Sequence, residues 1–376
     1  MKPLLSLASL LPALGLLPFA ASAQTYTLTD LGTLGGSQSG AYGINAAGTV
    51  VGYSNLAGDV AAHAFSYGGG VMTDLGSLGG SYSSAAAINA GGTVVGSSVL
   101  ADNATTHAFS SNGGVMTDLG SLGGSNSSAA AINTGGTVVG GSYTASDAAY
   151  HAFSYSGGVM TDLGTLGGAT SLAVGINASG TVFGLATTVG DENTYHAFSS
   201  LGGVMTDLGI FGDINSTAAA SNAAGTLVGA FSPDGAGATF HALSFSGGVR
   251  RDLGTLGLGK LSFANAINNA GTVVGKSTTD SLGNTQHAFI FRGGFMLDLN
   301  GAIPGAPGWE LTDANGINDA GQIVGVGENP QGHLDAYLLT PITAVPEPGE
   351  YAGLAGLTLV AFGAWRRTRH ASVARN

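Results

Sequence analysis

Short apolar runs recur along the chain, and turns rich in glycine and asparagine separate them. One stretch contains four such runs, at residues 85–89, 93–96, 107–111 and 115–119. Runs of this length that are rich in β-branched and aromatic residues favour strands and leave little room for helix. The pattern therefore predicts an all-β chain built from groups of four short strands.

The four-strand pattern repeats with a period of 44 to 46 residues, which His-Ala-Phe or His-Ala-Leu marks along the chain. An Asp-Leu step recurs at Asp30, Asp74, Asp118, Asp162, Asp207, Asp252 and Asp298, and the Asn after the first predicted strand recurs at Asn45, Asn89, Asn133, Asn177, Asn222, Asn268 and Asn318. These matching intervals indicate seven copies of one unit. A period of this size is typical of propellers and solenoids.

The first and last strands of the repeat array distinguish these two architectures. Residues 26–31 form a predicted fourth strand without its own third strand, and residues 335–339 form a predicted third strand without a fourth. A ring joins the two into one unit and removes exposed sheet edges, whereas a solenoid usually has atypical capping repeats instead. We therefore predict that residues 24–343 form a seven-bladed β-propeller of four-stranded blades, closed by the N-terminal strand.

The third and fourth strands of each unit are predicted to form a tight hairpin. Asn112-Gly113 is the candidate two-residue loop, with Ser156-Gly157 and Ser246-Gly247 as its counterparts. Asn-Gly is the strongest sequence signal for a type I′ hairpin turn. With that loop, Phe109 is expected opposite Met116, and His107 opposite Asp118.

A histidine and an aspartate are separated by 11 residues in six units. The pairs are His63 and Asp74, His107 and Asp118, His151 and Asp162, His196 and Asp207, His241 and Asp252, and His287 and Asp298. An Asp-oriented His is half of a catalytic triad, but the same pair also satisfies two polar side chains across a hairpin. Six equivalent copies favour the structural role, because an active site breaks symmetry. No catalytic residue is predicted.

The N-terminus has the organisation of a secretory signal peptide. A lysine near the start is followed by an apolar run over residues 4–20 and by Ala21-Ser22-Ala23. This order predicts that residues 1–23 are removed by signal peptidase after Ala23. An N-terminal membrane anchor is the alternative.

The C-terminal segment, residues 344–376, contains a second targeting pattern. Val345, Pro346, Glu347 and Pro348 precede an apolar stretch at residues 351–365, and Arg366 and Arg367 follow it. This order resembles the PEP-CTERM sorting signal of Gram-negative bacteria. The resemblance implies a short transmembrane helix held transiently in the inner membrane, recognition by an exosortase, and delivery to the cell surface or an exopolysaccharide matrix. A plain C-terminal tail anchor is the alternative.

The repeated motifs also resemble a known family. His-Ala-Phe, Thr-Asp-Leu-Gly-Ser-Leu-Gly-Gly, Ile-Asn-x-x-Gly and Val-Val-Gly are similar to the HAF-repeat family of bacterial extracellular proteins, and the similarity covers nearly the whole body. It implies export and a repeated β architecture, without a reaction. The seventh copy departs from the motif because Asp335 stands where the histidine is expected, and the fifth has Leu243 in place of phenylalanine.

The charge balance limits the partners. Charged residues make up 9% of the chain, the formal net charge is −12, and no Lys or Arg occurs between Gln24 and Val249. This balance excludes nucleic acid as an expected partner. There is no cysteine for a thiolate metal site. We expect no metal or cofactor. Ca²⁺ bound by the repeated Asp residues stays open as an alternative, although no copy has the spacing of a dedicated calcium loop.

Taken together, these features predict an exported, surface-sorted and non-catalytic structural or binding module of the cell envelope or exopolysaccharide matrix. Its partners would be exopolysaccharide or surface proteins. The alternative is a polysaccharide lyase or hydrolase on a propeller scaffold. Trp309 and Glu310 are unique residues that either line a glycan pocket or pack within an insertion. Recognition is expected where the loops between second and third strands meet the Leu-Gly-Gly turns.

Overall fold

The chain forms a series of antiparallel meanders, and each meander corresponds to one repeat of the sequence. The computed structural model describes residues 24–213, 216–233 and 239–342, and the body Thr25–Ile342 is one compact unit. In repeat 2, β6 (Gly79–Ile88), β7 (Val94–Leu100), β8 (Thr106–Asn112) and β9 (Val115–Asp118) pair in that order. The predicted all-β class is confirmed.

The other repeats have the same order of antiparallel pairs. Repeat 1 consists of β2 (Gly35–Ile44), β3 (Val50–Leu56), β4 (Ala62–Gly68) and β5 (Val71–Asp74). Repeat 3 consists of β10 (Gly123–Ile132), β11 (Val138–Thr144), the 3₁₀ turn η1 (Ala145–Asp147), β12 (Tyr150–Ser156) and β13 (Val159–Asp162). Repeat 4 consists of β14 (Gly167–Ile176), β15 (Val182–Thr188), β16 (Asp191–Leu201) and β17 (Val204–Asp213). Repeat 5 consists of β18 (Thr217–Ser221), β19 (Leu227–Phe231), β20 (His241–Ser246) and β21 (Val249–Gly254), and repeat 6 of β22 (Ser262–Ile267), β23 (Val273–Thr278), β24 (Gln286–Arg292) and β25 (Phe295–Asp298), with η2 (Leu299–Ala302) after it.

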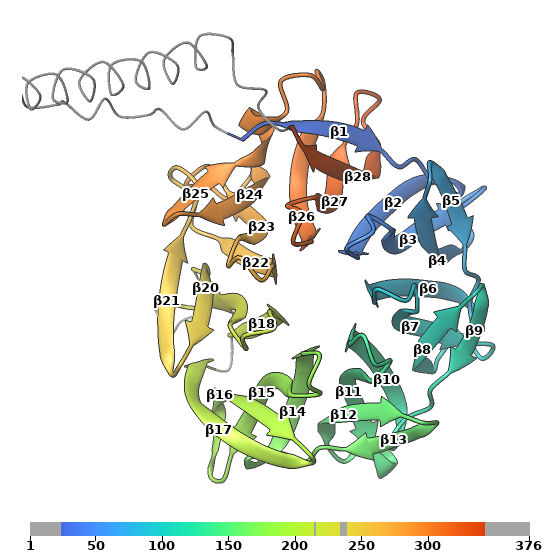
Figure 1. The fold of residues 1–376 in the computed structure, drawn as a ribbon, viewed down its shortest axis with the longest axis vertical. Helices are drawn as coiled ribbons and strands as arrows, with labels where there is room; N and C mark the ends of the chain where they lie inside the picture. Colours follow the sequence, from blue (N-terminus) through green and yellow to red (C-terminus); the bar gives the residue numbers. More distant parts are fainter. Residues whose placement is uncertain (1–23, 214–215, 234–238, 343–376) are drawn as a thin grey trace, which may run out of the picture. The chain divides into compact units, whose positions relative to one another are not determined.

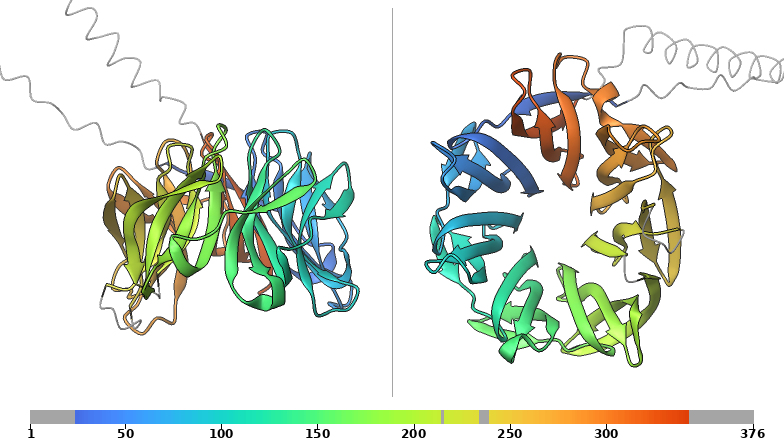
Figure 2. Two further views of the ribbon diagram at one scale, coloured as in Figure 1. Left: turned by 90° about the horizontal axis from the view of Figure 1, so that it is seen from below. Right: turned by 180° about the vertical axis from the view of Figure 1, so that it is seen from behind.

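The body of the chain is a β-propeller. Its sheets stand around a central axis, with the first strand of each repeat innermost and the last strand outermost (Figure 1). Figure 2 shows the same ring from the side and from behind. Single parallel bridges, such as the one between Ala62 and Tyr82, join neighbouring meanders.

The two ends of the body meet in the closing repeat. This repeat combines β26 (Glu310–Ile317), β27 (Ile323–Glu328) and β28 (Leu334–Pro341) with β1 (Tyr26–Asp30) from the start of the body. β1 runs antiparallel to β28, with Leu28 opposite Leu339 and Asp30 opposite Tyr337. The predicted pairing of the first strand with the last is confirmed, and it leaves the ring without a free sheet edge at this point.

The core lies between neighbouring sheets. Val51 and Ala64 of repeat 1 pack against Val94 and Phe109 of repeat 2 in one buried cluster. Phe109 is fully buried, and burial of such a side chain stabilises the fold by about 1.5–3 kcal/mol. Successive side chains of a strand point to opposite faces of the sheet. The Ala and the Phe of each His-Ala-Phe motif therefore pack against two different neighbouring sheets.

The glycine of Val-Val-Gly is required by close backbone approach. Gly96 lies opposite Ala85 on one side and Phe109 on the other, where β6 contains a bulge. A Cβ atom on Gly96 would overlap the carbonyl oxygen of Ser84 and lie 3.0 Å from the ring of Phe109. The repeated Gly is therefore part of the packing between strands and not a turn residue.

The predicted hairpin turn is wrong by one residue, so each cross-strand partner is displaced by two residues. Asn112 pairs with Val115, so the two-residue loop is Gly113-Gly114, and Phe109 lies opposite Asp118. Both glycines have positive φ, +60° and +82°, as a type I′ turn requires. Glycine adopts that conformation at lower cost than asparagine, which explains why the turn lies one residue further along, at Gly113-Gly114. The counterparts Ser156-Gly157 and Ser246-Gly247 are shifted in the same way.

Both targeting segments lie outside the described residues. These are the predicted signal peptide at residues 1–23 and the sorting segment at residues 344–376, with Val345, Pro346, Glu347, Pro348, Arg366 and Arg367. Within the described part of the chain, the structure contains no helix with the length and apolar character needed to span a membrane.

Candidate functional site

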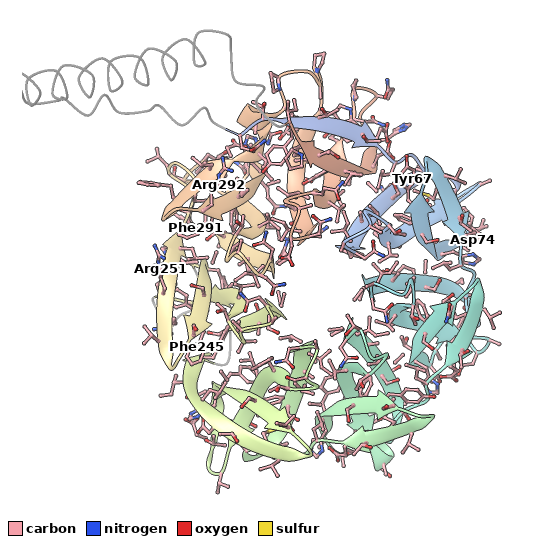
Figure 3. The ribbon with its side chains drawn as sticks, viewed as in Figure 1. Tyr67, Asp74, Phe245, Arg251, Phe291 and Arg292 are labelled. Carbon is pink, nitrogen blue, oxygen red and sulfur yellow. The ribbon has the colours of Figure 1, made fainter. Side chains whose placement is uncertain are left out.

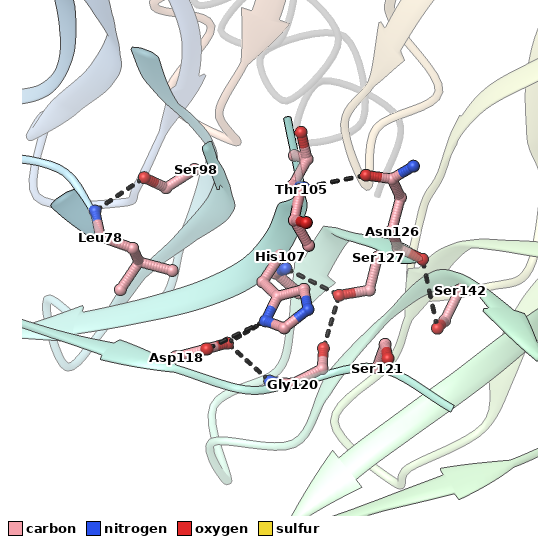
Figure 4. Close-up of polar contacts among 12 residues, drawn as sticks. Leu78, Ser98, Thr105, His107, Asp118, Gly120, Ser121, Asn126, Ser127 and Ser142 are labelled. Atoms are coloured by element: carbon pink, nitrogen blue, oxygen red, sulfur yellow. Dashed lines mark hydrogen bonds and ion pairs between the residues drawn. The ribbon is translucent and has the colours of Figure 1, made fainter. Parts of the chain in front are cut away.

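Each predicted His/Asp pair is brought within hydrogen-bonding distance. In repeat 2, Nδ1 of His107 lies 2.9 Å from the carboxylate of Asp118 (Figure 4). The shortest Nδ1–oxygen distance is 2.9 Å for His63 and Asp74, 2.8 Å for His151 and Asp162, 2.8 Å for His196 and Asp207, 2.9 Å for His241 and Asp252, and 2.6 Å for His287 and Asp298. The corrected register makes the contact diagonal, because Asp118 stands opposite Phe109.

The surroundings of these pairs fit a structural role. Asp118 also accepts a hydrogen bond of 2.7 Å from the backbone N–H of Gly120, so one carboxylate connects the outer strand, the following turn and β8. Ser127 then bridges this turn to the neighbouring strand, accepting from the N–H of Ala108 at 2.8 Å and donating to the carbonyl of Gly120 at 2.5 Å (Figure 4). The contacts hold the sheets of adjacent repeats together.

A belt of asparagine side chains runs around the ring. Nδ2 of Asn89 donates to the carbonyl of Asn133 in the next repeat, and Oδ1 of Asn89 accepts from the N–H of Thr93 in its own turn. We call each such hydrogen bond, from an Asn Nδ2 to a backbone carbonyl of the next repeat, a step of the belt. The remaining steps lead from Asn45 to Asn89, Asn133 to Asn177, Asn177 to Ala223, Asn222 to Asn268, Asn268 to Asn318, and Asn318 to Asn45. The last step joins the closing repeat to repeat 1 and completes the circle.

The inner strands surround a channel along the axis. A cavity of about 650 Å³ is lined in each repeat by residues close to the C-terminal end of the innermost strand. A second cavity of about 370 Å³ lies at the asparagine belt. Small residues such as Ala86, Ala130 and Ala219 line much of the larger cavity.

One sector of this channel breaks the symmetry. At the position three residues before the belt Asn, the repeats in order have Tyr42, Ala86, Ala130, Val174, Ala219, Asn265 and Asn315. Two residues earlier they have Gly40, Ser84, Ser128, Leu172, Thr217, Phe263 and Asp313. On the second strand, directly after the Val-Val-Gly glycine, they have Tyr53, Ser97, Gly141, Leu185, Ala230, Lys276 and Val326. Aromatic, amide and charged residues at these positions thus occur in repeat 6, the closing repeat and repeat 1, which are adjacent in the ring.

We call this group, together with Tyr82 of the neighbouring repeat 2, the mouth cluster. It consists of Tyr42, Tyr53, Tyr82, Phe263, Asn265, Lys276, Asp313 and Asn315. Three of them, Tyr42, Asn265 and Asn315, line the 650 Å³ cavity.

The polar half of the mouth cluster is centred on Asp313. Its carboxylate accepts hydrogen bonds from Lys276 at 3.1 Å and from Asn265 at 2.6 Å. Asn265 also donates to Oδ1 of Asn315 at 3.2 Å, and Asn315 donates to the carbonyl of Ala41 at 3.0 Å. Burial raises the pKa of Asp313, and the neighbouring Lys276 ammonium opposes that shift. The result is a preorganised network that spans three repeats.

The aromatic half of the mouth cluster is a row of tyrosines. The rings of Tyr42 and Tyr53 are stacked with centroids 5.8 Å apart, and Tyr53 and Tyr82 follow at 6.4 Å. Burial raises the pKa of Tyr42, and Tyr53, Tyr82 and Asp313 raise it further. Tyr42 and Tyr82 nevertheless keep 37% and 41% of their surface exposed. This row therefore offers aromatic surface to solvent beside the Asp313 network.

A second aromatic pair lies beside Lys276. Phe240 and Phe263 stack with centroids 5.5 Å apart, and the Lys276 ammonium lies 5.9 Å from the Phe263 ring centre. A cation at that distance from an aromatic ring is attracted to it. Aromatic side chains therefore lie beside the polar network both in repeat 1 and in repeat 6.

Other unique residues lie away from the channel. The Arg251 guanidinium packs 5.2 Å from the ring centre of Phe291, and both lie towards the outer side of the ring, as does Arg292 (Figure 3). Trp309 packs against the core cluster of the closing repeat, and the carboxylate of Glu310 lies 3.6 Å from Nε2 of His287. Neither Trp309 nor Glu310 lines one of the two cavities. Of the two sequence-based interpretations, the contacts of Trp309 favour packing within the insertion.

Loop carboxylates serve as turn caps. Asp102 accepts from the N–H groups of Ala104 and Thr105 and from the Thr105 hydroxyl. Asp59 likewise accepts from the N–H of Ser37 in the Leu-Gly-Gly turn, which places this turn beside the loop between second and third strands. Across residues 24–213, 216–233 and 239–342, no group of three or more His, Cys, Asp or Glu side chains is arranged to hold a metal ion.

Comparison with known proteins adds the following. No protein-family model matches the chain, and no curated protein matches it. TolB from Acinetobacter baumannii has a similar structure with a TM-score of 0.42 and 12% identity; the match covers 56% of this chain and 53% of TolB, about half of that protein. A triple arginine-to-alanine mutant of AofleA from Arthrobotrys oligospora matches with a TM-score of 0.40 and 14% identity, over 73% of this chain and 88% of AofleA. Neither similarity bears on the function of the chain.

Proposed function

We propose that this chain is an exported, non-catalytic binding module for polysaccharide at the cell surface or in an exopolysaccharide matrix. The observation behind this proposal is the mouth cluster, which breaks the symmetry of the ring and contributes Tyr42, Asn265 and Asn315 to the lining of the 650 Å³ cavity. Binding sites combine apolar and aromatic surface with a few convergent polar groups, and the mouth cluster has that composition. The His/Asp pairs and the asparagine belt, by contrast, recur from unit to unit with few exceptions.

The scaffold in this proposal is a seven-bladed propeller of four-stranded blades. The seven steps of the asparagine belt support that number, as does the pairing of β1 with β28. In this arrangement the six His/Asp pairs are structural, since they are equivalent and none of them belongs to the mouth cluster.

The charges at the site support a non-catalytic role. Glycoside hydrolysis generally uses two carboxyl groups on opposite sides of the scissile bond. The mouth cluster contains one carboxylate, Asp313, and it is already bonded to Lys276 and Asn265. A polysaccharide lyase or hydrolase remains the rival proposal, with Glu310 as its candidate acid beside His287.

Export is supported by the two ends of the sequence. The signal peptide pattern of residues 1–23 and the PEP-CTERM resemblance of Val345, Pro346, Glu347 and Pro348 favour processing by signal peptidase and an exosortase. The HAF-repeat resemblance of the body favours the same extracellular destination.

The test is to incubate the purified full-length chain with a panel of soluble polysaccharides. Affinity electrophoresis measures binding, and the release of reducing ends or unsaturated products measures cleavage. We expect retardation by at least one polymer without chain cleavage. Cleavage that Glu310→Gln abolishes would establish the enzyme instead, and no retardation by any polymer would refute the binding module.

A further inference from the structure

We infer that the mouth cluster binds uncharged pyranose units of a polysaccharide, with Tyr42, Tyr53 and Tyr82 as the stacking surface. The Asp313 network supplies the hydrogen bonds to the sugar hydroxyls. This inference rests on the proposed binding function and specifies its site and its ligand class.

The tyrosine row matches the two kinds of surface on a pyranose ring. A pyranose has an apolar face of C–H groups and a polar edge of hydroxyls, and a tyrosine likewise combines an apolar ring with a polar end. Tyr42 and Tyr53 are stacked with an angle of 25° between their planes, and Tyr82 continues the row at 42° to Tyr53. Three consecutive rings provide an extended surface, which suits a chain of sugars better than a single small molecule.

The Asp313 network provides both donors and acceptors next to this row. A sugar hydroxyl both donates and accepts, so it is matched by groups of both kinds. Asp313 offers carboxylate oxygens, Asn265 and Asn315 offer amide groups, and Lys276 offers an ammonium. Since these side chains already fix one another by hydrogen bonds at 2.6–3.2 Å, little conformational freedom is lost when a ligand binds.

Charge selects against an acidic polymer. Within the mouth cluster, the ammonium of Lys276 and the carboxylate of Asp313 compensate each other. The loops between second and third strands present exposed carboxylates such as Asp59 and Asp102. Hydrogen bonds from Thr105 and Ala104 lower the pKa of Asp102 to about 2, so it is ionised at neutral pH. A polyanion approaching this end of the ring would be repelled, and an uncharged polymer would not.

The cavity beside the cluster has room for part of such a sugar chain. Its volume of about 650 Å³ lies within the range of about 300–1,000 Å³ that is usual for small-ligand sites. Apart from Val174, its other walls consist of Ala, Gly, Ser and Ile positions such as Ala86 and Ser84, which leave room next to the large side chains of one sector.

The experiment compares matched variants of the full-length chain by isothermal titration with dextran and laminarin as neutral polymers and alginate as the acidic one. Tyr42→Ala and Tyr53→Ala each remove one ring, and Tyr42→Phe keeps the ring without its hydroxyl. Tyr143→Ala is the control, because Tyr143 is also 37% exposed and also contacts another ring, that of Tyr150, but it belongs to repeat 3. Circular dichroism melting verifies that each variant is folded.

We expect the wild type and Tyr143→Ala to bind at least one neutral polymer with the same affinity. Tyr42→Ala and Tyr53→Ala should weaken that binding about tenfold, and Tyr42→Phe should weaken it less than threefold. Unchanged neutral-polymer binding in the two alanine variants would refute the site while leaving the binding module intact. Binding of alginate in preference to both neutral polymers would refute the ligand class. Binding of none of the wider panel would refute the proposed function itself.

Discussion

Asp335 on β28 stands where the other repeats have their histidine, diagonal to Asp30 on β1. The closing repeat therefore brings two acids together at the place of a His/Asp pair. Asp335 is 6% exposed; one of its oxygens accepts from Asn329 at 2.6 Å, and the other has no hydrogen-bond partner within the described part of the chain. Burial raises the pKa of Asp335, and the nearby Asp30 raises it further. This seam of the ring, where β28 meets β1, therefore lacks the imidazole–carboxylate contact that the other six repeats have.

Asp335→His should strengthen this seam. A histidine here can pair with Asp30 as His107 pairs with Asp118, and it removes a buried carboxylate oxygen that lacks a partner. We expect the free energy of unfolding at pH 7 to rise by about 1 kcal/mol. Chemical denaturation of the full-length chain at pH 7 measures the change. A decrease in stability would show that the bond from Asn329 outweighs the new pair.

The pH dependence of the seam has a defined sign. Because the folded-state pKa of Asp335 is raised, the folded chain binds its proton more tightly than the unfolded chain does. The stability that this proton provides is fully present below the unfolded pKa of about 4 and is lost as pH rises through the folded pKa. Asp335→Asn cannot titrate, so the advantage of the variant over the wild type should be larger at pH 7 than at pH 4. Equal advantages at both values would contradict the raised pKa.

Removal of one His/Asp pair should affect stability and not binding. His107→Ala leaves Asp118 without its imidazole partner, although Asp118 keeps its bond from Gly120 and is 41% exposed. We expect a loss of about 1 kcal/mol in the free energy of unfolding and an unchanged polysaccharide affinity. His151→Ala is the matched control and should give the same loss, since the two pairs are equivalent. A selective loss of binding in one of the two variants would argue against a purely structural role.

The asparagine belt should contribute more per residue than the exposed pairs. Asn89→Ala removes the bond to the carbonyl of Asn133 and the bond from the N–H of Thr93, at a position that is 7% exposed. The expected loss is about 1–3 kcal/mol, because buried backbone groups lose their partners. Asn112→Ala, at an exposed hairpin position, should change the stability by less than about 0.5 kcal/mol. Thermal melting of both variants measures the difference.

Much of the ring could be predicted because its information is local and repeated. Each strand is a short run between turn residues, and the incomplete ends at Leu28 and Tyr337 indicate closure from the order of motifs alone. The spacing of His107 and Asp118 was also sufficient to identify their contact. The turn was misplaced because Asn112-Gly113-Gly114 contains two candidate dipeptides, and only the backbone φ values distinguish them.

The mouth cluster was missed for a different reason. Tyr42, Asn265 and Asn315 are far apart in the sequence, and none of them belongs to a recognisable motif. They share only a position within the repeat, so they appear as a group when the seven units are aligned on the belt asparagine. The hydrogen bond from Asn89 to Asn133 was also missed, because a contact between equivalent residues of neighbouring repeats depends on how the sheets are packed.

The two kinds of repeated glycine should respond differently to alanine. At Gly96 the backbone is not left-handed, but a Cβ atom would overlap the Ser84 carbonyl and press on the Phe109 ring, so Gly96→Ala must separate two strands of the same sheet. Overpacking of this kind costs about 1–3 kcal/mol or more. At Gly113 no atom lies within 4 Å of the added Cβ, and the cost of Gly113→Ala is the positive φ of +60°, about 1 kcal/mol. Denaturant melts should therefore rank wild type above Gly113→Ala and Gly113→Ala above Gly96→Ala. The reverse order would mean that β6 and β7 can separate at low cost, which the buried position of Phe109 argues against.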